Sequence, residues 1–212
     1  MRESGGLGFA SAGAVLDRNL RADVKAKSFA DCVAERRDMW RLESYAQPVQ
    51  ATVDAMVRAI RSGGRVYFFG NGGSAAQAQH FAAELSGRFL KDRPAWGALA
   101  LSVDTSALTA IANDYGFEHV FARQLQGLVS AGDVACGLTT SGTSANVIAG
   151  LAVARRNAAV TVAFTGNGGG TIVAEADIAL VGPDGPSWKV QEVHLVLGHI
   201  ICELVELALT VS

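Results

Sequence analysis

The sequence predicts an α/β fold: a three-layer, doubly wound parallel sheet of the flavodoxin-like kind, with a helical hairpin at the N-terminus. Short apolar runs recur along the chain, and stretches of helical periodicity separate them. Runs this unbroken suit strands that are buried on both faces, as in a parallel sheet. The 212 residues suffice for one such domain and are cramped for two. We therefore expect residues 22–212 to form a single domain, with residues 1–21 as a flexible extension rich in Gly, Ser and Ala.

The elements follow in a regular order. Between Asp23 and Ser62 apolar residues recur on helical faces, and Pro48 predicts a break between two helices. Five expected strands then lie at 66–69, 98–101, 134–138, 160–164 and 178–181. The last helix, about 187–211, is apolar over more than half of its circumference, which is wider than packing on a sheet requires. That face predicts burial between subunits.

Composition and charge exclude several classes of function. A net charge of −2, with no long run of either sign, gives no electrostatic reason to expect nucleic-acid or membrane-surface binding. Half of the residues are hydrophobic and 18% are charged, so a lone monomer would have a surface poor in charge. Three widely spaced cysteines predict neither a disulfide framework nor a cysteine zinc site. We expect a cytoplasmic protein, without export signal or membrane span, that binds a small molecule and other subunits.

A glycine-rich loop, Gly70-Asn-Gly-Gly-Ser-Ala75, follows the first expected strand. Glycines between a strand and a helix let backbone N–H groups approach an anion at the positive end of the helix. One alternative is a plain helix cap at Ser74. Another is a dinucleotide site, because the run also reads G-x-G-x-x-A, but Asp104, the available acidic residue, lies well beyond the usual spacing of about 20 residues.

A second loop, Thr139-Thr-Ser-Gly-Thr-Ser144, follows the third expected strand. Five hydroxyl groups and a glycine before a helix suit a dianionic phosphate, which short side chains and backbone N–H groups can surround without a lysine. The simpler alternative is a helix cap with a Ser/Thr turn, which needs only one or two hydroxyls. The composition therefore favours a phosphate site at the carboxyl ends of the strands.

Polar side chains on two expected helices could hold a metal ion or a substrate. Gln77, His80, Glu84 and Arg88 would fall on one helical stripe, where His80 and Glu84 form either a ligand pair or an ordinary exposed contact. The last helix carries Gln191, Glu192, His199, Glu203 and Glu206 within one arc of roughly 120°, with His194 outside it. A solvated stripe would look the same. Spacing alone does not establish a metal site.

Four segments together resemble one known family. They are Gly70–Arg88 (GNGGSAAQAQHFAAELSGR), Ala112–Phe117 (ANDYGF), Thr140–Asn146 (TSGTSAN) and Gln191–His199 (QEVHLVLGH). They resemble the phosphoheptose isomerases, which are sugar isomerase (SIS) domain proteins, and the resemblance runs from about Ala30 to Leu209. Four motifs in the same order make a chance similarity improbable, whereas one alone would be weak.

The resemblance implies an aldose–ketose isomerase that converts sedoheptulose 7-phosphate to D-glycero-D-manno-heptose 7-phosphate through an enediol, the first step of ADP- or GDP-heptose biosynthesis. It implies a cytoplasmic homotetramer, with active sites at subunit contacts and one zinc ion per site. By position, His80, Glu84, Gln191 and His199 would be the metal ligands, with Glu84 as base and His199 as acid. The substrate would be bound by Asn71, Gly72, Gly73, Ser74, Arg88, Asp104, Thr139, Thr140, Ser141, Ser144 and Gln191.

The chain departs from the family pattern at a few positions. Gln77 stands where Asp is usual, Trp188 and Lys189 replace a small or acidic residue followed by Arg, and Thr139 and Thr143 stand where Ser and Asn are commoner. The lost charge and added bulk predict altered sugar contacts and slower turnover that Gln77→Asp would restore. One alternative is therefore a related seven- or eight-carbon sugar phosphate as substrate. A second alternative is a non-catalytic SIS-domain regulator of a replication initiator, but such relatives lose the Glu84 and His199 pair that is present here.

Overall fold

The computed structural model describes residues 27–37, 39 and 42–211, which fall into two units divided after Arg37. In the first unit, α1 (Phe29–Arg37) begins with a capping box, because the Ser28 backbone donates to Asp31 Oδ2 at 2.9 Å and the Asp31 backbone donates to Ser28 Oγ at 3.1 Å. The expected extension at 1–21 lies outside the described residues. The expected pairing of two N-terminal helices in a hairpin stays a prediction, because each unit is described by itself.

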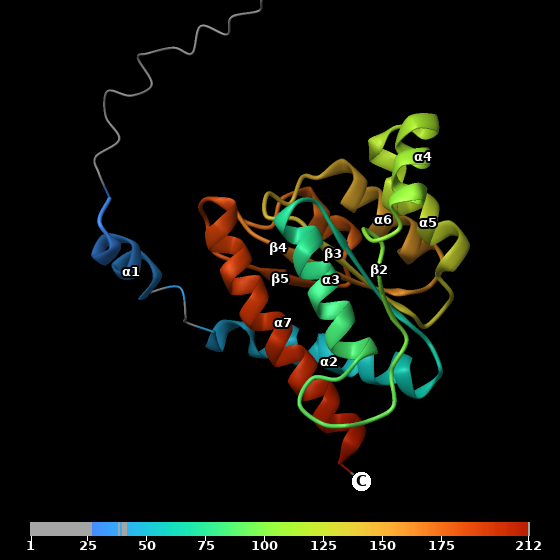
Figure 1. Ribbon diagram of the computed structural model, residues 1–212, viewed down its shortest axis with the longest axis horizontal. Helices are drawn as coiled ribbons and strands as arrows, with labels where there is room; N and C mark the ends of the chain where they lie inside the picture. The colour runs from blue at the N-terminus through green and yellow to red at the C-terminus, as the bar shows by residue number, and fades with distance from the viewer. Residues whose placement is uncertain (1–26, 38, 40–41, 212) are drawn as a thin grey trace, which may run out of the picture. The chain divides into compact units, whose positions relative to one another are not determined.

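The second unit is built on a five-stranded parallel sheet in the order β2-β1-β3-β4-β5 (Figure 1). The strands are β1 (Val66–Gly70), β2 (Ala98–Ala100), β3 (Val134–Leu138), β4 (Val160–Thr165) and β5 (Ile178–Val181). The prediction of a parallel α/β sheet is confirmed. The two central strands pair in register from Val66–Val134 to Gly70–Leu138, so the two polar loops leave the sheet side by side.

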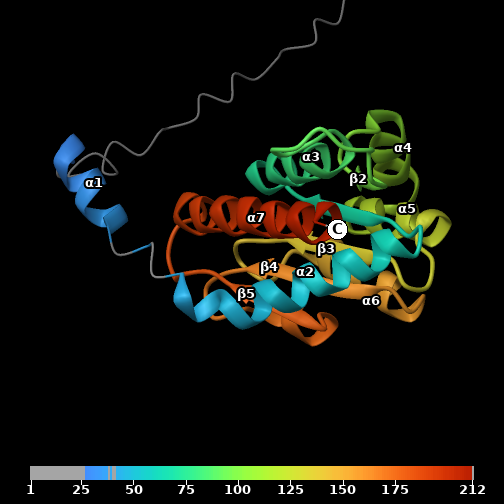
Figure 2. The ribbon, with the colours of Figure 1, turned by 90° about the horizontal axis from the view of Figure 1, so that it is seen from below.

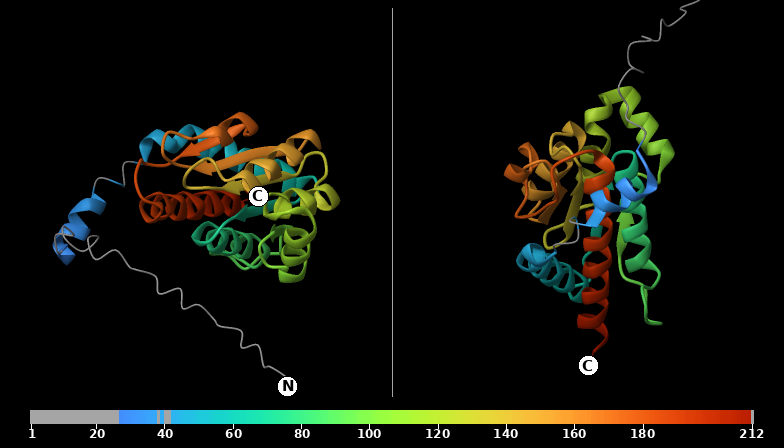
Figure 3. Two further views of the ribbon diagram at one scale, coloured as in Figure 1. Left: turned by 90° about the horizontal axis from the view of Figure 1, so that it is seen from above. Right: turned by 90° about the vertical axis from the view of Figure 1, so that its left-hand side faces the viewer.

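Helices cover both faces of this sheet (Figures 2 and 3). One face carries α2 (Ala46–Arg61), α3 (Gly73–Ser86) and α7 (Ser187–Thr210), with α7 between the other two; the opposite face carries α4 (Thr105–Tyr115), α5 (Val120–Leu128) and α6 (Ala145–Arg156). Short 3-10 turns lie at Glu43–Tyr45, Phe117–His119 and Thr171–Glu175. Two apolar cores result, one on each face, and the aromatic rings of Phe81 and Phe164 pack 6.0 Å apart in the first.

The break between two helices predicted near Pro48 agrees with the structure, in which α2 begins two residues before the proline and continues through it. The first N–H groups of a helix have no partner within it, so the missing N–H of Pro48 breaks no helical hydrogen bond. Thr52 Oγ1 donates to the Pro48 carbonyl at 2.8 Å, one turn further on. The amphipathic face of α2 then packs Val49, Val53 and Met56 into the core.

By length and composition, α7 is the one helix among the described residues that could cross a membrane. Its apolar residues, however, belong to the protein core: Val193, Leu197, Ile201 and Val205 are buried against the sheet and neighbouring helices. The apolar character of α7 therefore follows from its central place in the three-layer fold.

His194 ties α7 to the end of β4. Its Nε2 lies 2.8 Å from the Thr165 carbonyl and donates to it, while its Nδ1 has no partner among the described residues, and the ring is fully buried. Burial lowers the pKa of His194 from 6.5 to about 4, and the hydrogen bond to Thr165 only partly opposes this shift. The folded protein therefore binds fewer protons than the unfolded chain between these two pH values, and the stability gained from neutral His194 is lost as the pH falls through that window.

We expect this one group to lower the free energy of unfolding by about 3 kcal/mol between pH 7 and pH 4. His194→Gln should remove this part of the pH dependence, because the glutamine Nε2 can donate the same hydrogen bond without titrating. Urea denaturation at several pH values, with a chelator present, measures the difference. His119→Gln, which alters an exposed histidine, is the control. Equal pH dependence in wild type and His194→Gln would show that His194 does not titrate abnormally.

Candidate active site

The glycine-rich loop brings the N-terminus of α3 against the end of β3. A Cβ atom on Gly70 would lie 2.7 Å from the Leu138 carbonyl oxygen, so glycine permits this close approach. Gly72, with a φ of 55°, makes the turn into the helix, and Ser74 is buried in its first turn. The loop sequence is thus needed to place the helix N-terminus next to the second loop.

Between the two loops lies a pocket of about 320 Å³. It is lined by Asn71, Gly72, Gly73, Ser74, Leu138, Thr139, Thr140, Ser144, Ser187 and Gln191. Thr139 Oγ1 lies 2.8 Å from Ser144 Oγ, and Thr140 Oγ1 lies 3.0 Å from Ser187 Oγ. None of these lining residues is charged, so hydroxyl groups and the N-termini of α3, α6 and α7 supply the attraction for an anion.

Three predicted substrate residues do not line the pocket. Ser141 is exposed beside it, with its Oγ 3.3 Å from Thr139 Oγ1. Asp104 caps α4 by accepting a hydrogen bond from the Ala107 backbone at 2.9 Å. Arg88 is exposed beyond the end of α3 at Ser86, so the helical stripe expected to include it ends at Glu84. Contact of these three residues with substrate stays a prediction.

Ser187, which lines the pocket, and Asn167, which binds the pocket residue Thr140, escaped the sequence analysis. Ser187 begins α7 and faces Thr140, and its position after Pro186, at the start of a helix, is the signal that could have identified it. Asn167, after β4, connects the loop that precedes α6 with the loop that precedes α7. Its Nδ2 donates to the carbonyls of Thr140 at 3.0 Å and Gly185 at 3.2 Å, and its Oδ1 accepts from the Gly185 backbone at 2.8 Å. Its φ of 52° is one that asparagine tolerates better than most residues.

The loops after β3 and β4 also touch backbone to backbone. Gly142 lies against Gly169 and Gly170, and a Cβ on Gly170 would lie 2.6 Å from the Gly142 carbonyl carbon. The Ile172 backbone donates to the Gly142 carbonyl at 2.9 Å. The hydroxyl loop is therefore braced from behind by the glycine loop 168–170.

One to three turns further along α3, a cluster of possible metal ligands joins α3 to α7. His80 Nε2 lies 2.7 Å from His199 Nε2 and 3.4 Å from Glu84 Oε1, and the three ligand atoms all lie within 4.8 Å of one another. The side chain of His80 is 44% exposed and that of Glu84 20%, so a substrate can reach them. Two imidazoles and a carboxylate suit a catalytic metal ion that keeps one position open.

Gln191, the fourth predicted metal ligand, lines the hydroxyl-lined pocket between the two loops. A Cβ on Gly73 would lie 2.6 Å from Gln191 Nε2, which shows how closely the amide packs on the start of α3. Glycine at position 73 makes room for this side chain. The role of Gln191 as a metal ligand stays a prediction, while its place in the pocket lining agrees with a substrate contact.

Comparison with known proteins identifies the family. The SIS domain family matches residues 32–166 of this chain. The phosphoheptose isomerase of Aquifex aeolicus (strain VF5) is 50% identical over 165 residues, which cover 78% of this chain and 86% of the relative. That of Roseiflexus sp. (strain RS-1) is 47% identical, with 78% and 84% covered. The chain belongs to the phosphoheptose isomerase family of SIS-domain proteins.

Solved structures of this family have the same fold. Phosphoheptose isomerase GmhA from Neisseria gonorrhoeae superposes with a TM-score of 0.76 at 39% identity, and covers 84% of this chain and 94% of its own. A phosphoheptose isomerase from Francisella tularensis gives 0.79 at 30% identity, with 83% and 95% covered. The family expected from the four sequence motifs is confirmed.

Gln77, a departure from the usual pattern of phosphoheptose isomerases, has a structural role in this chain. It is buried, and its Nε2 donates to the backbone carbonyl of Gln191 at 2.6 Å, while its Oε1 finds no partner in the part of the chain that the structure describes. An aspartate, ionised and without a donor, could not make this bond. The expectation that Gln77→Asp would restore activity stays a prediction, and this hydrogen bond favours the opposite outcome.

We expect Gln77→Asp to destabilise the protein by about 1–3 kcal/mol and to lower kcat/KM, because a buried carboxylate would face the Gln191 carbonyl. Thermal denaturation and steady-state kinetics measure the two effects. Gln79→Asp, the same change at an exposed position of α3, is the control. A gain in kcat/KM for Gln77→Asp would support the sequence-based expectation instead.

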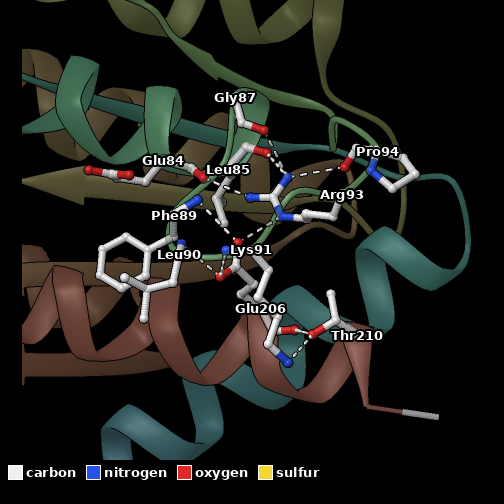
Figure 4. A network of polar contacts seen from close by, with 10 residues as sticks. All are labelled: Glu84, Leu85, Gly87, Phe89, Leu90, Lys91, Arg93, Pro94, Glu206 and Thr210. Atoms are coloured by element: carbon white, nitrogen blue, oxygen red, sulfur yellow. Dashed lines mark hydrogen bonds and ion pairs between the residues drawn. The ribbon is translucent and has the colours of Figure 1, made fainter.

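The polar arc predicted on α7 is not a uniform solvated stripe. Glu203 is exposed, but His199 belongs to the cluster with His80 and Glu84, and Glu206 is only 2% exposed. Glu206 instead binds the segment that follows α3 (Figure 4). The solvated interpretation of this arc is therefore wrong for Glu206.

Proposed function

We propose that this chain converts sedoheptulose 7-phosphate to D-glycero-D-manno-heptose 7-phosphate, as the first step of ADP- or GDP-heptose biosynthesis. The observation that carries the proposal is the cluster of His80, Glu84 and His199, which lies further along α3 from the uncharged, hydroxyl-lined pocket at the start of that helix. The names of its relatives, phosphoheptose isomerases, support the same reaction. A non-catalytic regulatory role is not favoured, since the acid and base candidates lie together and accessible to solvent.

The chemistry assigns a task to each group. The hydroxyl loops hold the phosphate, while Glu84 removes a proton from C1 of the ketose and His199 donates a proton to the C2 carbonyl oxygen, which gives the enediol. His199 then accepts the proton of the C1 hydroxyl, and Glu84 returns its proton to C2, so that the aldose forms. Each group ends the cycle in its starting protonation state.

The donor set at the cluster fits zinc, and we assign His80, Glu84, His199 and Gln191 as the residues that would hold it. When bound, the ion would polarise substrate oxygens and stabilise negative charge on the enediolate. Because a metal ligand is a weak base, Glu84 acts in proton transfer only while it is not tightly coordinated.

Incubation of the purified protein with sedoheptulose 7-phosphate, followed by measurement of the aldose product, tests the proposal. We expect conversion of the phosphorylated sugar and none of unphosphorylated sedoheptulose, because the pocket supplies the binding energy through the phosphate. Absence of conversion in zinc-supplemented protein would contradict the proposed function.

We also propose a cytoplasmic homotetramer with active sites at subunit contacts. Apolar side chains remain exposed on β2 and α4 and in the segments next to them, from 40% for Leu99 to 60% for Val103, and α7 exposes Leu195 and Leu207. Such side chains are typical of surfaces that a second subunit covers. Light scattering should give a mass four times that of the 22.0 kDa chain, and a monomeric mass at micromolar concentration would overturn this assembly.

A further inference from the structure

Glu206, near the end of α7, is a buried carboxylate whose two oxygens are both fully used (Figure 4). Its Oε1 accepts from the Phe89 backbone at 3.1 Å and from Arg93 Nε at 3.0 Å. Its Oε2 accepts from the backbones of Leu90 at 2.8 Å and Lys91 at 2.9 Å. Burial opposes ionisation, but these four hydrogen bonds outweigh it, so the pKa of Glu206 lies below its ordinary value.

Arg93 extends the same network to the end of α3. Its Nη2 donates to the Glu84 carbonyl at 2.8 Å, and its Nη1 donates to the Leu85 carbonyl at 2.9 Å and the Gly87 carbonyl at 3.1 Å. A third bond from Nη1 reaches the Pro94 carbonyl at 3.1 Å. The guanidinium carbon lies 3.6 Å from the centre of the Trp96 ring, so one face of the group is covered as well.

The network acts on residues of the candidate active site. Arg93 holds the backbone of Glu84 itself, within the last turn of α3. Glu206 holds the backbone of Phe89, whose ring centre lies 6.0 Å from that of His199. Glu84, the proposed base, and His199, the proposed acid, therefore both contact the segment after α3 that Arg93 and Glu206 hold in place.

An ion pair this deeply buried is weak evidence for stability, because apolar side chains of similar volume can stabilise a core equally well. An apolar pair, however, cannot hydrogen-bond to the backbone carbonyls at the end of α3 or to the three backbone N–H groups of the segment that follows it. The Arg93 guanidinium and the Glu206 carboxylate do both, with side chains that are 3% and 2% exposed. The pair therefore supplies directional contacts between α3 and α7.

We propose that Arg93 and Glu206 are positioning residues that fix the last turn of α3 against α7 and so set the placement of Glu84 relative to His80 and His199. Their role in turnover rests on the proposed isomerase function. The hydroxyl-lined pocket lies at the opposite end of α3, around Gly73 and Ser74. Neither Arg93 nor Glu206 lines that pocket. The proposal therefore predicts a loss in kcat that substrate binding does not share.

Glu206→Gln and Arg93→Lys test this placement. Glu206→Gln keeps the size of the side chain but loses the charge and one acceptor. Arg93→Lys keeps the charge but loses the planar guanidinium group that donates to several backbone carbonyls at once. We expect each to lower kcat about 10- to 100-fold, with KM and the inhibition constant of inorganic phosphate changed by no more than about twofold. Zinc affinity, measured by titration of the metal-free protein, should fall about tenfold.

Asp92→Asn removes an exposed carboxylate of the same segment, and Arg123→Lys makes the lysine change on the opposite face of the sheet. Both controls should behave as wild type. Retention of kcat and zinc affinity by both test variants would overturn the proposal. A fall in kcat accompanied by an equally large rise in KM and an equally large weakening of phosphate binding would also overturn it. If wild type itself does not isomerise sedoheptulose 7-phosphate, the proposed function fails, and the zinc titration alone decides the positioning role.

A variant that does not fold is replaced by the double variant Arg93→Met/Glu206→Leu, which removes both charges together and so leaves no unpaired charge in the core. A folded double variant with reduced kcat and weakened zinc binding supports the positioning role. Wild-type kcat and zinc affinity in that protein would show that the pair serves packing alone.

Discussion

Glu84→Gln is expected to lower kcat by about 10²–10⁴-fold, the usual contribution of a general base, while the fold and assembly stay intact. The amide keeps the size of the side chain but cannot accept a proton from carbon. Glu84 is partly exposed, and within the described part of the chain the polar partner of its carboxylate is His80, so its replacement there leaves no buried group unpaired. Steady-state kinetics, circular dichroism and light scattering on the same preparation measure the three properties.

Glu203→Gln is the matched control, since Glu203 is an exposed carboxylate on α7 outside the cluster. It should retain the kcat of wild type. Near-normal turnover in Glu84→Gln would mean that another group takes the proton, and loss of the folded state would mean that Glu84 is structural.

His199→Ala is expected to cause a loss of similar size. The change removes the proposed acid and, at the same time, one nitrogen of the cluster, whose Nε2 lies 2.7 Å from that of His80. Zinc affinity should therefore fall together with kcat, whereas the binding of inorganic phosphate in the hydroxyl-lined pocket should not change.

His119→Ala, at an exposed histidine next to α5, should leave all three quantities unchanged. A His199→Ala variant with normal kcat would contradict the assignment of the acid. Normal zinc affinity with reduced kcat would restrict His199 to proton transfer and leave His80 and Glu84 as the protein ligands.

The sheet could be predicted because its strands are short, largely apolar runs, and the inner strands β1, β3 and β4 are buried on both faces. The pocket followed from the same reasoning, since parallel neighbours such as β1 and β3 bring their following loops together. The cluster on α3 and α7 could not be predicted from the spacing of its residues along the sequence alone, because a polar stripe on a helix can equally face solvent. Its residues were identified by family resemblance, and the distances among His80, Glu84 and His199 now show that they meet.

What escaped prediction depends on single polar contacts between distant parts of the chain. Arg93 and Glu206 are 113 residues apart, and neither shows a local pattern that marks it as buried. Asn167 stands in a glycine-rich turn whose composition predicts a loop but not the hydrogen bonds to Thr140 and Gly185. The break near Pro48 could be predicted for a local reason, because proline is common in the first turn of a helix.

The backbone contact between Gly142 and the glycine loop 168–170 limits how this site can evolve. Any side chain at Gly142 would collide with the Gly169 carbonyl, and positive φ angles at Gly168, Gly169 and Gly170 disfavour side chains there too. This side of the proposed phosphate pocket therefore tolerates few substitutions. Changes at Gln77 and Ser187 would also be costly, because they would break the contacts with Gln191 and Thr140. We therefore expect adaptation to a different sugar to begin at other positions, such as Trp188 in the first turn of α7.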